Sequence, residues 1–556
     1  MSIFEHYKSR YEAAKEEEYT IQEFLALCKS DKSCYASAAE RLLLAIGQPE
    51  LIDTAQDPKL SRLFSNRVIA RYPAFSEFYG MEDAIEQIVS YLKHSAQGLE
   101  ERKQILYLLG PVGGGKSSLA EKLKHLMQQV PIYYLKGSPV YDHPLCLFDV
   151  NEDGNILQQE YGIPKRYLRN IMSPWASKRL HEFNGDISQF KVVKKYPSIL
   201  DQLAIAKTEP GDENNQDIAS LVGKVDIRKL EHFAQNDPDA YSYSGALCRA
   251  NQGLMEFVEM FKAPIKVLHP LLTATQEGNY NGTEGLAALP FDGIILAHSN
   301  ESEWQTFRNN KNNEAFLDRV YIVKVPYCLR VSEEMRIYQK LLEHSELNAA
   351  PCSPGTLISL AQFAVLSRLK TPDNSSVYSK MRVYDGESLK DTDPKAKSYQ
   401  EYRDYAGVDE GMTGLSTRFA FKILSRVFNF DSTEVAANPV HLFYVLEQQI
   451  EREQFPADVA ERYLEHLKGY LIPKYIEFIG KEIQTAYLES YSEYGQNLFD
   501  RYVTYADFWI QDQEYRDPET GQLFDRGSLN AELEKTEKPA GISNPKDFVT
   551  LLSNFF

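Results

Sequence analysis

The sequence lacks the marks of a disulfide-stapled, zinc-bound or membrane-spanning protein. Its six cysteines include no pair at CxxC spacing, which argues against a disulfide framework or zinc site and favours a reduced, cytoplasmic chain. No stretch approaches about 18 consecutive apolar residues, so we expect no transmembrane helix and no membrane partner. The N-terminal segment MSIFEHYKSRYEAAKEEEYT is charged from the start and has no apolar core, so no signal peptide is predicted.

Basic residues are also in deficit. The 61 lysines and arginines face 79 aspartates and glutamates, which leaves a formal charge of −18. Such a chain repels a phosphate backbone at long range, so no nucleic-acid partner is expected. The composition, 43% apolar and 25% charged, is ordinary for a globular protein, and the length of 556 residues favours three or four domains.

Several families of catalytic motif are missing. The 11 histidines form no HExxH and no His/Cys cluster, so metal-dependent hydrolysis is not expected. There is no GxSxG around a plausible nucleophile and no GxGxxG, HRD or DFG set of the common protein kinases. A Ser–Lys dyad stays open, because it depends on proximity in space.

Periodicity divides the chain into four regions. We expect a small helical domain over 1–65, an α/β nucleotide-binding core over 66–345, a helical lid with a polar insertion over 346–425, and a mainly helical domain over 426–556. In the first region, Thr20 with Glu23 and Ser37 with Glu40 fit capping boxes that open helices. Pro473 is expected to break or kink the helical run of 439–500.

The core region alternates strand and helix patterns. Predicted strands cover 105–109, 132–135, 294–297 and 320–325, and helical spacing covers 81–92 and 119–130. This order is typical of a doubly wound α/β fold with a parallel sheet. The polar stretch 207–240 is expected to be a surface insertion, and 370–412 a mobile or partner-facing loop or an insertion.

One motif carries chemistry directly. The run GPVGGGKSS follows the first predicted strand and opens a helix, which is the context of a P-loop. Its glycines let backbone N–H groups approach phosphate oxygens, Lys116 neutralises the β- and γ-phosphates, and the Ser117 hydroxyl can hold Mg²⁺. The alternative is a glycine-rich turn with a solvated lysine. The predicted nucleotide-binding residues here are Gly110, Pro111, Val112, Gly113, Gly114, Gly115, Lys116, Ser117 and Ser118.

Three further residues are candidates for catalysis at this site. Asn300 follows a buried strand and could orient a water or an acceptor, or simply cap the strand end. Arg319 precedes the next strand and could reach a neighbouring subunit's γ-phosphate, or pair with an acidic neighbour on the surface. Arg418 opens a helix after the polar insertion and could reach the phosphates from a lid, or be a solvated helix residue.

These features together resemble the AAA+ superfamily and, within it, the PrkA family of bacterial serine protein kinases. The phrases that carry the likeness include FSEFYGMEDAIEQIV, YLLGPVGGGKSSL, CRANQGLMEFVEMFKAP and AFLDRVYIVKVPYCLR. The likeness covers about 1–546, and it implies a longer basic tail than the ending VTLLSNFF offers. It also implies that Tyr79 and Gly80 lie on the adenine side of the site.

The resemblance implies a function as well. It implies transfer of the ATP γ-phosphoryl group to serine or threonine of a protein substrate, in a stress or starvation response, with ATP and Mg²⁺ as cofactors. In the same likeness Asn300 corresponds to sensor 1, Arg319 to the arginine finger and Arg418 to sensor 2. An arginine finger acting in trans implies a homo-oligomer, with a hexameric ring as one form.

One departure from the AAA+ pattern affects turnover. The superfamily has an acidic pair at the end of a strand, and alignment through Arg249 places Gly245 and Ala246 at that position. Glu256 and Glu259, which we expect on the following helix, would substitute or form a solvated helix face. Three functions therefore stay open: a protein kinase, an AAA+ ATPase that remodels proteins or assists proteolysis, and a nucleotide-gated scaffold with little turnover.

Overall fold

The computed structural model describes residues 3–13, 16–168, 171–210, 217–310, 313–518, 521–538, 542 and 545–555. The chain forms two compact units, Met1–Tyr463 and Leu464–Phe556, and each is described by itself. The division into four domains made from the sequence stays a prediction. In the described residues, no helix combines the length and the apolarity that a membrane crossing requires.

A five-stranded parallel sheet forms the centre of the first unit. Its strand order is β14 (Val320–Lys324), β4 (Ile105–Leu109), β13 (Ile294–Ser299), β10 (Leu254–Val258) and β7 (Ile205–Thr208). The strands predicted at 105–109, 294–297 and 320–325 are confirmed, and so is the doubly wound α/β class. The polar stretch after residue 207 therefore begins within an edge strand of this sheet.

Helices cover both faces of the sheet. Along β4, Ile105, Tyr107 and Leu109 pack into one core with α10 (Ala246–Ala250), α11 (Ile265–Glu277) and α12 (Glu301–Arg308). The alternate residues Leu106 and Leu108 pack into a second core with α3 (Ala38–Ile46), α5 (Glu82–Gln97) and α6 (Lys116–Met127). Because successive side chains of a strand point to opposite faces, a strand buried on both faces is apolar throughout, as β4 is.

One predicted strand belongs elsewhere. Residues Ile132–Leu135 form β5 as expected, but β5 lies in a separate antiparallel sheet with β6 (Lys191–Lys195) and β1 (Glu17–Thr20). Strand β1 was not predicted, because EEYT has no apolar pattern. Both capping boxes are confirmed, at the starts of α2 (Ile21–Ser30) and α3.

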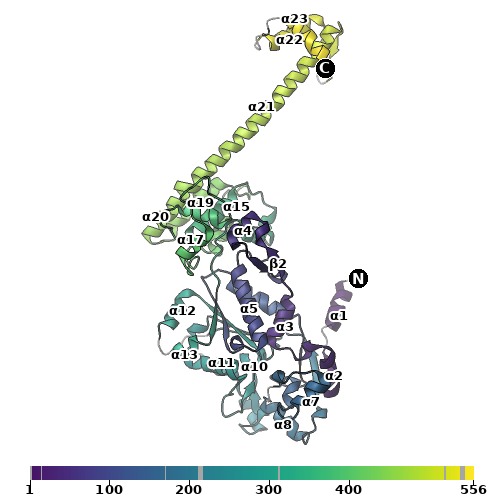
Figure 1. The fold of residues 1–556 in the computed structure, drawn as a ribbon, viewed down its shortest axis with the longest axis vertical. Helices are drawn as coiled ribbons and strands as arrows, with labels where there is room; N and C mark the ends of the chain where they lie inside the picture. The colour runs from purple at the N-terminus through teal and green to yellow at the C-terminus, as the bar shows by residue number, and fades with distance from the viewer. Residues whose placement is uncertain are drawn as a thin grey trace. The chain divides into compact units, whose positions relative to one another are not determined.

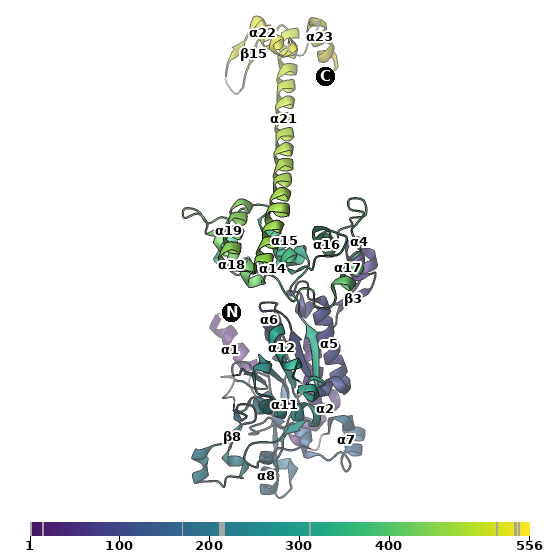
Figure 2. The ribbon, with the colours of Figure 1, turned by 90° about the vertical axis from the view of Figure 1, so that its left-hand side faces the viewer.

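The helices after the central sheet gather at one end of the first unit, while α7 (Gly154–Tyr161) and α8 (Pro174–Glu182) lie at its other end (Figure 1). Figure 2 shows the same separation from the side. The helices of this group, called the lid below, are α14 (Val331–Glu343), α15 (Thr356–Arg368), α16 (Val377–Tyr384), α17 (Tyr399–Ala406), α18 (Thr417–Phe428) and α19 (Pro439–Arg452). Two smaller helices of this unit are α4 (Pro58–Phe64), which lies beside α17, and α13 (Glu314–Leu317).

The segment 370–412 is not the mobile loop that its polar composition suggested. It contains α16 and α17, and an ion pair between Lys380 and Glu410 is fully buried within it. The Tyr384 hydroxyl also donates to Glu410, at 2.5 Å. Polar side chains that neutralise one another can fill an interior, so of the alternatives that the sequence left open only the mobile loop is excluded.

The second unit contains the long helix α21 (Ile472–Ile510), followed by α22 (Arg526–Glu537) and α23 (Pro545–Phe555). Pro473 lies in the first turn of α21, directly after a π-helical turn at His466–Leu471. Proline has no N–H to donate and crowds the carbonyl four residues earlier, so the change from π- to α-helix falls where the sequence predicted a break. Tyr502, Tyr505 and Leu529 contribute to a small core in this unit.

Candidate nucleotide site

The P-loop joins the carboxyl end of β4 to the amino end of α6. Gly113 and Gly115 have φ of 78° and 91°, a conformation that favours glycine. A Cβ on Gly110 would lie 2.1 Å from the carbonyl oxygen of Val325, so only glycine fits there. The loop therefore turns tightly, and the free N–H groups of the α6 amino end face the space outside it.

Lys116 is held inside this loop. Its side chain is buried and its ammonium donates to the carbonyl oxygens of Gly110 and Pro111, both at 2.7 Å. Burial lowers the pKa of Lys116 to about 8, the Glu303 carboxylate opposes that shift, and the Arg418 charge adds to it. A triphosphate would restore the solvation that the buried ammonium has lost, so the free site favours an anion.

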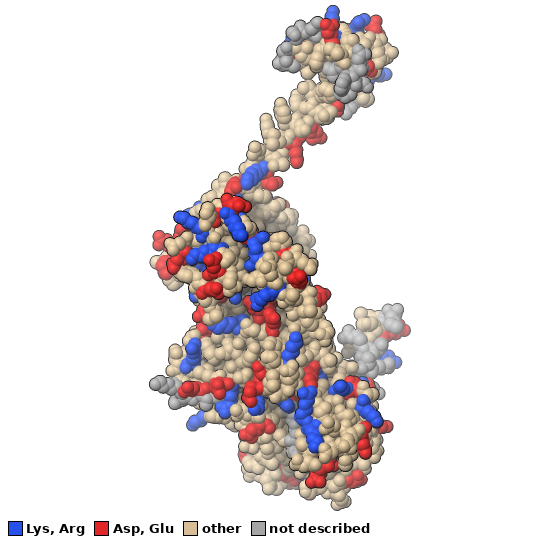
Figure 3. All heavy atoms as spheres, in the orientation of Figure 1, with Lys and Arg blue, Asp and Glu red and all other residues tan. Residues whose placement is uncertain are grey.

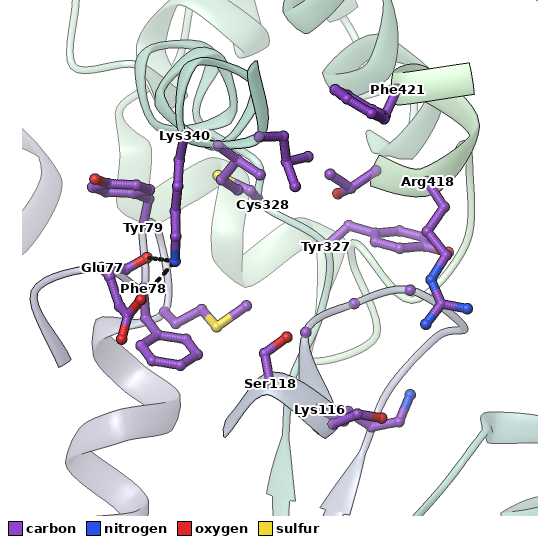
Figure 4. Close-up of a pocket in the computed structure, with 18 residues that line it drawn as sticks. Glu77, Phe78, Tyr79, Lys116, Ser118, Tyr327, Cys328, Lys340, Arg418 and Phe421 are labelled. Carbon is purple, nitrogen blue, oxygen red and sulfur yellow. Dashed lines mark hydrogen bonds and ion pairs between the residues drawn. The ribbon is translucent and has the colours of Figure 1, made fainter. Parts of the chain in front are cut away.

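A cavity of about 390 Å³ opens above the loop (Figure 4). One side is polar and is formed by the P-loop with Lys116, Ser117, Ser118 and Arg418. The other side is mainly apolar and is formed by Phe78, Met81, Cys328, Ile337, Leu341 and Phe421. A polar end with cations beside an apolar slot matches a ligand that has an anionic tail and a flat apolar head.

The predicted adenine-side residues lie at this apolar side. Tyr79 lines the cavity, and the Arg336 guanidinium stacks 4.3 Å from the centre of its ring. Gly80 has φ of 73°, and a Cβ there would lie 2.6 Å from Sγ of Cys328. The backbone at 79–80 therefore packs against the segment after β14 as closely as a glycine allows.

A carboxylate bridge closes the same side. Glu77 accepts from Lys340 of α14 at 2.8 Å and from Lys122 of α6 at 2.9 Å. The two lysines hold the pKa of Glu77 low, at about 2. Figure 4 shows Lys340 extending down to Glu77. This bridge connects the lid to the core beside the apolar side of the cavity.

Arg418 lies over the P-loop, as a lid residue in contact with phosphates would. It stands in the first turn of α18, and a Cβ on Gly113 would meet its Cγ and Cδ at 3.6 and 3.7 Å. In Figure 4 its guanidinium extends to the loop side of the cavity. Beside it the Tyr327 hydroxyl donates to the carbonyl of Val112 at 2.6 Å. Arg418 of the lid and Tyr327 of the segment that leads into it therefore both lie beside the P-loop.

The acidic residues do not lie where the alignment placed them. Gly245 is the N-cap of the short helix α10, so Gly245 and Ala246 are not at a strand end, and that assignment was wrong. Glu256 and Glu259 are not on a following helix either: Glu256 lies within β10, and Glu259 comes directly after it. Because β10 is parallel to β13 and β4, Glu259 reaches the same edge of the sheet as the P-loop.

Asn300 also lies at this edge, because it directly follows Ser299, which pairs with Leu109 at the carboxyl end of β4. It caps α12: its side chain accepts from the N–H of Glu303 at 2.9 Å and donates to the Glu303 carboxylate at 2.8 Å. The charge of Glu303 in turn acts to raise the pKa of Lys116, against the effect of burial. The Lys262 ammonium lies 3.6 Å from the Glu303 carboxylate and 2.6 Å from the Glu259 carboxylate, so it links the two. Asn300, Glu259 and Glu303 therefore form one polar group at the carboxyl end of the sheet, where the P-loop also lies.

Glu256 has a different role from Glu259. It is buried between Lys124 of α6, at 2.6 Å, and His298 of β13, at 3.0 Å. Burial raises its pKa, but hydrogen bonds from these two partners bring the pKa below the ordinary value. This ion pair fastens α6, and thereby the P-loop, to the sheet.

The structure does not bring Arg319 to the cavity of its own chain. Its carbonyl accepts from the N–H of Ile105, which places it at the amino end of β14 and β4. The P-loop follows the opposite end of β4, about 16 Å away for a five-residue strand. An action on a nucleotide in the same chain is thus ruled out by position.

Reasoning from the sequence missed four contributors: Glu303, Tyr327, Lys340 and the position of Glu259. The only visible signal for Glu303 was its place three residues after the helix-capping Asn300. Glu259 follows the apolar run LMEFV, but the glutamate inside that run hid the strand.

Comparison with known families decides the relationship. The model of the PrkA AAA domain matches residues 19–376, and that of the PrkA serine protein kinase C-terminal domain matches residues 378–552. The chain belongs to the PrkA family. Its central sheet and P-loop supply the nucleotide-binding fold of the first of these domains.

Relatives within the PrkA family have two different names. The serine/threonine kinase YeaG of Escherichia coli K12 is 82% identical over 559 residues, covering 100% of this chain and 87% of the relative. The ATP-dependent protease PrkA of Bacillus subtilis is 35% identical over 465 residues, covering 80% and 71%. Among solved structures, the Thermotoga maritima RuvB branch migration motor matches with a TM-score of 0.30 and 10% identity over 67% and 70% of the two chains.

Proposed function

We propose that this PrkA-family chain binds ATP with Mg²⁺ and transfers the γ-phosphoryl group to serine or threonine of a protein substrate. One observation carries the proposal: Lys116, Arg418 and the P-loop converge on the polar end of a cavity whose other end is apolar. The name of the E. coli relative supports the choice of reaction. From the family resemblance we further propose a role in a stress or starvation response.

The residues of the chain divide the work of holding the triphosphate. The P-loop amides and the Lys116 ammonium neutralise the β- and γ-phosphates at the amino end of α6. Arg418 approaches from the lid and stabilises the charge that develops as the terminal phosphoryl group departs. The apolar slot beside Phe78 and Leu341 receives the base.

The site also offers oxygen donors that suit Mg²⁺. The Ser117 hydroxyl follows Lys116 in the first turn of α6, and the Glu303 carboxylate lies in the first turn of α12, just after the neighbouring strand β13. In the described parts of the chain no group of three or more His, Cys, Asp or Glu side chains forms a metal cage. This fits an ion that takes one or two protein ligands together with phosphates and water. When bound, the ion would neutralise charge on the β- and γ-phosphates.

Glu259 is the proposed base. Its carboxylate accepts the proton of the substrate hydroxyl, the hydroxyl oxygen forms a bond to the γ-phosphorus, and the bond from that phosphorus to the β–γ bridging oxygen breaks. ADP leaves with the electron pair of the broken bond. Asn300 acts as a positioning residue. It holds Glu303 by two hydrogen bonds, and Glu303 and Glu259 both contact Lys262, so Asn300 helps to position Glu259.

Labelled ATP tests the proposal. The purified chain with [γ-³²P]ATP, Mg²⁺ and a mixture of candidate substrate proteins should label serine or threonine. Lys116→Ala should abolish labelling and nucleotide binding, and Glu259→Gln should abolish labelling alone. Lys103→Ala, an exposed lysine at the far edge of the sheet, serves as the control. Labelling that survives in Lys116→Ala would contradict the proposal.

A second candidate is ATP-driven remodelling of proteins or assistance to proteolysis. The position of Arg319 at the edge opposite the P-loop favours it, because an arginine finger of this kind acts on the nucleotide of a neighbouring subunit and not on that of its own chain. The name of the B. subtilis relative agrees with it. Release of free phosphate with no labelled protein, lost in Arg319→Ala together with nucleotide-dependent assembly, would support this candidate against the kinase.

The scaffold with little turnover loses its main argument. It depended on Gly245 and Ala246 replacing the acidic pair, and those residues lie elsewhere. Because Glu259 occupies the strand end that a catalytic carboxylate requires, we propose that the site turns ATP over. Tight binding with no labelled product and no free phosphate would return the scaffold to favour.

A further inference from the structure

Helix α21 carries an apolar stripe with a regular spacing. Ile476, Tyr487 and Leu498 lie 11 residues apart, and so do Ile483 and Tyr494. Tyr491 continues a third such row that begins at Gly480. Eleven residues make three turns of 3.67 residues each, so all three rows stay on one side of a nearly straight helix. Ordinary amphipathic helices that pack on a globular core seldom keep one period over so many turns.

The stripe is exposed along most of its length. Ile476, Ile483, Tyr487, Tyr491 and Tyr494 are between 64% and 68% exposed, and every residue from 480 to 501 is exposed. Figure 3 shows uncharged side chains over much of the visible side of this helix. The charged residues of the span occupy other positions of the repeat, and an isolated helix gains nothing from leaving such a stripe in water.

Two glycines lie on or beside the stripe at a cost to the helix. Gly480 and Gly495 are each about 1 kcal/mol less favourable than alanine inside a helix. Among the described residues outside the helix backbone, no heavy atom lies within 4 Å of a Cβ built on either. Within one chain nothing requires these glycines, whereas a second helix in close approach would.

The same stripe is a packing face where the chain covers it. Its rows continue to Tyr502 and Tyr505, which are 6% and 7% exposed and belong to the core of the second unit. The exposed part therefore extends an interface that is already buried at one end. The net charge argues against a membrane as the partner, because the span 474–501 has three basic and five acidic residues.

We propose that the exposed stripe pairs with the same stripe of a second copy of this chain, antiparallel and centred on Tyr487. About that centre Gly480 faces Tyr494 of the second copy, so a small residue meets a large one. Ile476 faces Leu498, and Ile483 faces Tyr491. A parallel pair would place Gly480 against Gly480 and Tyr494 against Tyr494, which leaves a gap at one level and crowding at the other.

The pairing would extend over the 23 residues from 476 to 498, about 34 Å of helix. It requires no nucleotide, since α21 contributes no residue to the cavity of the first unit. This separates it from assembly through Arg319, which the proposed function ties to the bound nucleotide. Failure of one therefore leaves the other standing.

Sedimentation equilibrium of the full chain without nucleotide tests the association. Wild type should form dimers at micromolar concentration. Tyr487→Glu should weaken dimerisation at least about a hundredfold, because two carboxylates would meet at the centre of a desolvated interface. Thr485→Glu adds the same charge on the opposite side of the helix and should leave the dimer unchanged. A monomeric wild type, or equal loss in both variants, would overturn the proposal.

Cysteine crosslinking tests the orientation. When Ile476→Cys and Leu498→Cys chains are mixed and oxidised, the antiparallel pair should give crosslinks between the two different variants. Crosslinks between two copies of Ile476→Cys would instead show a parallel pair and overturn the centre at Tyr487. Wild type, with its exposed Cys352, gives the background. Sedimentation with vesicles of anionic lipid completes the set: a monomer that binds them would assign the stripe to a membrane.

Discussion

Removal of the Arg368 guanidinium should test how the helices of the lid are held together beside the nucleotide site. Arg368 and Glu334 form an ion pair of 2.8 Å in which both side chains are 0% exposed. Burial disfavours the charge of Arg368, but the neighbouring carboxylate raises its pKa above the ordinary value. The guanidinium also donates to the carbonyl oxygens of Leu415 and Cys328, at 2.9 and 2.8 Å.

The expected cost of Arg368→Met follows from these contacts. Leaving Glu334 buried without its cation costs about 3–5 kcal/mol, and each carbonyl that loses its donor adds about 1 kcal/mol. The total, about 5 kcal/mol or more, is a large part of the usual stability of a domain. The ring of Tyr327, 4.8 Å from the guanidinium, would also lose its support against Val112, so nucleotide affinity should fall as well.

Thermal and urea unfolding, followed by circular dichroism, measure the effect. Arg382→Met is the matched control, because Arg382 forms a 2.8 Å pair with Glu387 at the surface and its loss should cost less than about 1 kcal/mol. The double variant Arg368→Met with Glu334→Leu should recover part of the loss, since no buried charge remains. If Arg368→Met unfolded at the same midpoint as Arg382→Met, the buried pair would not hold the helices of the lid together.

Three further predictions concern single positions. Gly80→Ala should lower the nucleotide affinity and the melting temperature, because its methyl group would lie 2.6 Å from Sγ of Cys328. The expected cost in stability is about 1–3 kcal/mol. Gly162→Ala is the control for backbone strain, because Gly162 has a similar φ of 71° and no neighbour that a methyl group would meet. Glu259→Gln should keep the affinity for ATP, measured by calorimetry, and slow phosphoryl transfer at least about a hundredfold in single-turnover assays. A normal rate of transfer would exclude Glu259 as the base. The pKa of Glu256 is lowered in the folded chain, so its ionised carboxylate should stabilise the fold fully at neutral pH. This stabilisation should be lost as the pH falls below the ordinary pKa of 4.5. The melting temperatures of Glu256→Gln and wild type should therefore differ more at pH 7 than at pH 3.5.

The P-loop and the sheet strands β4, β13 and β14 could be predicted from the sequence because their signals are local. The glycines of 110–115 are required by the turn itself, and β4 is apolar throughout because both its faces are covered. The capping boxes at Thr20 and Ser37 are local in the same way, since each involves residues three apart.

The errors arose where a distant partner decides the structure. Glu256 made LMEFV look unlike a buried strand, and its partners Lys124 and His298, both distant in sequence, make a carboxylate acceptable there. The run 132–135 has the pattern of a buried strand whichever sheet it joins. Lys380 and Glu410 appear as surface charges until their pairing is known.

The hydrogen bond from Tyr327 to Val112 links two movements that are separate in many binding proteins. The loop that receives the phosphates cannot shift without shifting the segment after β14, and that segment carries the first helix of the lid. A ligand that fills only the apolar slot, such as adenosine, leaves this link undisturbed. Loss of the terminal phosphate should therefore shift the lid together with the P-loop, so the position of the lid should differ between the ATP-bound and ADP-bound chain.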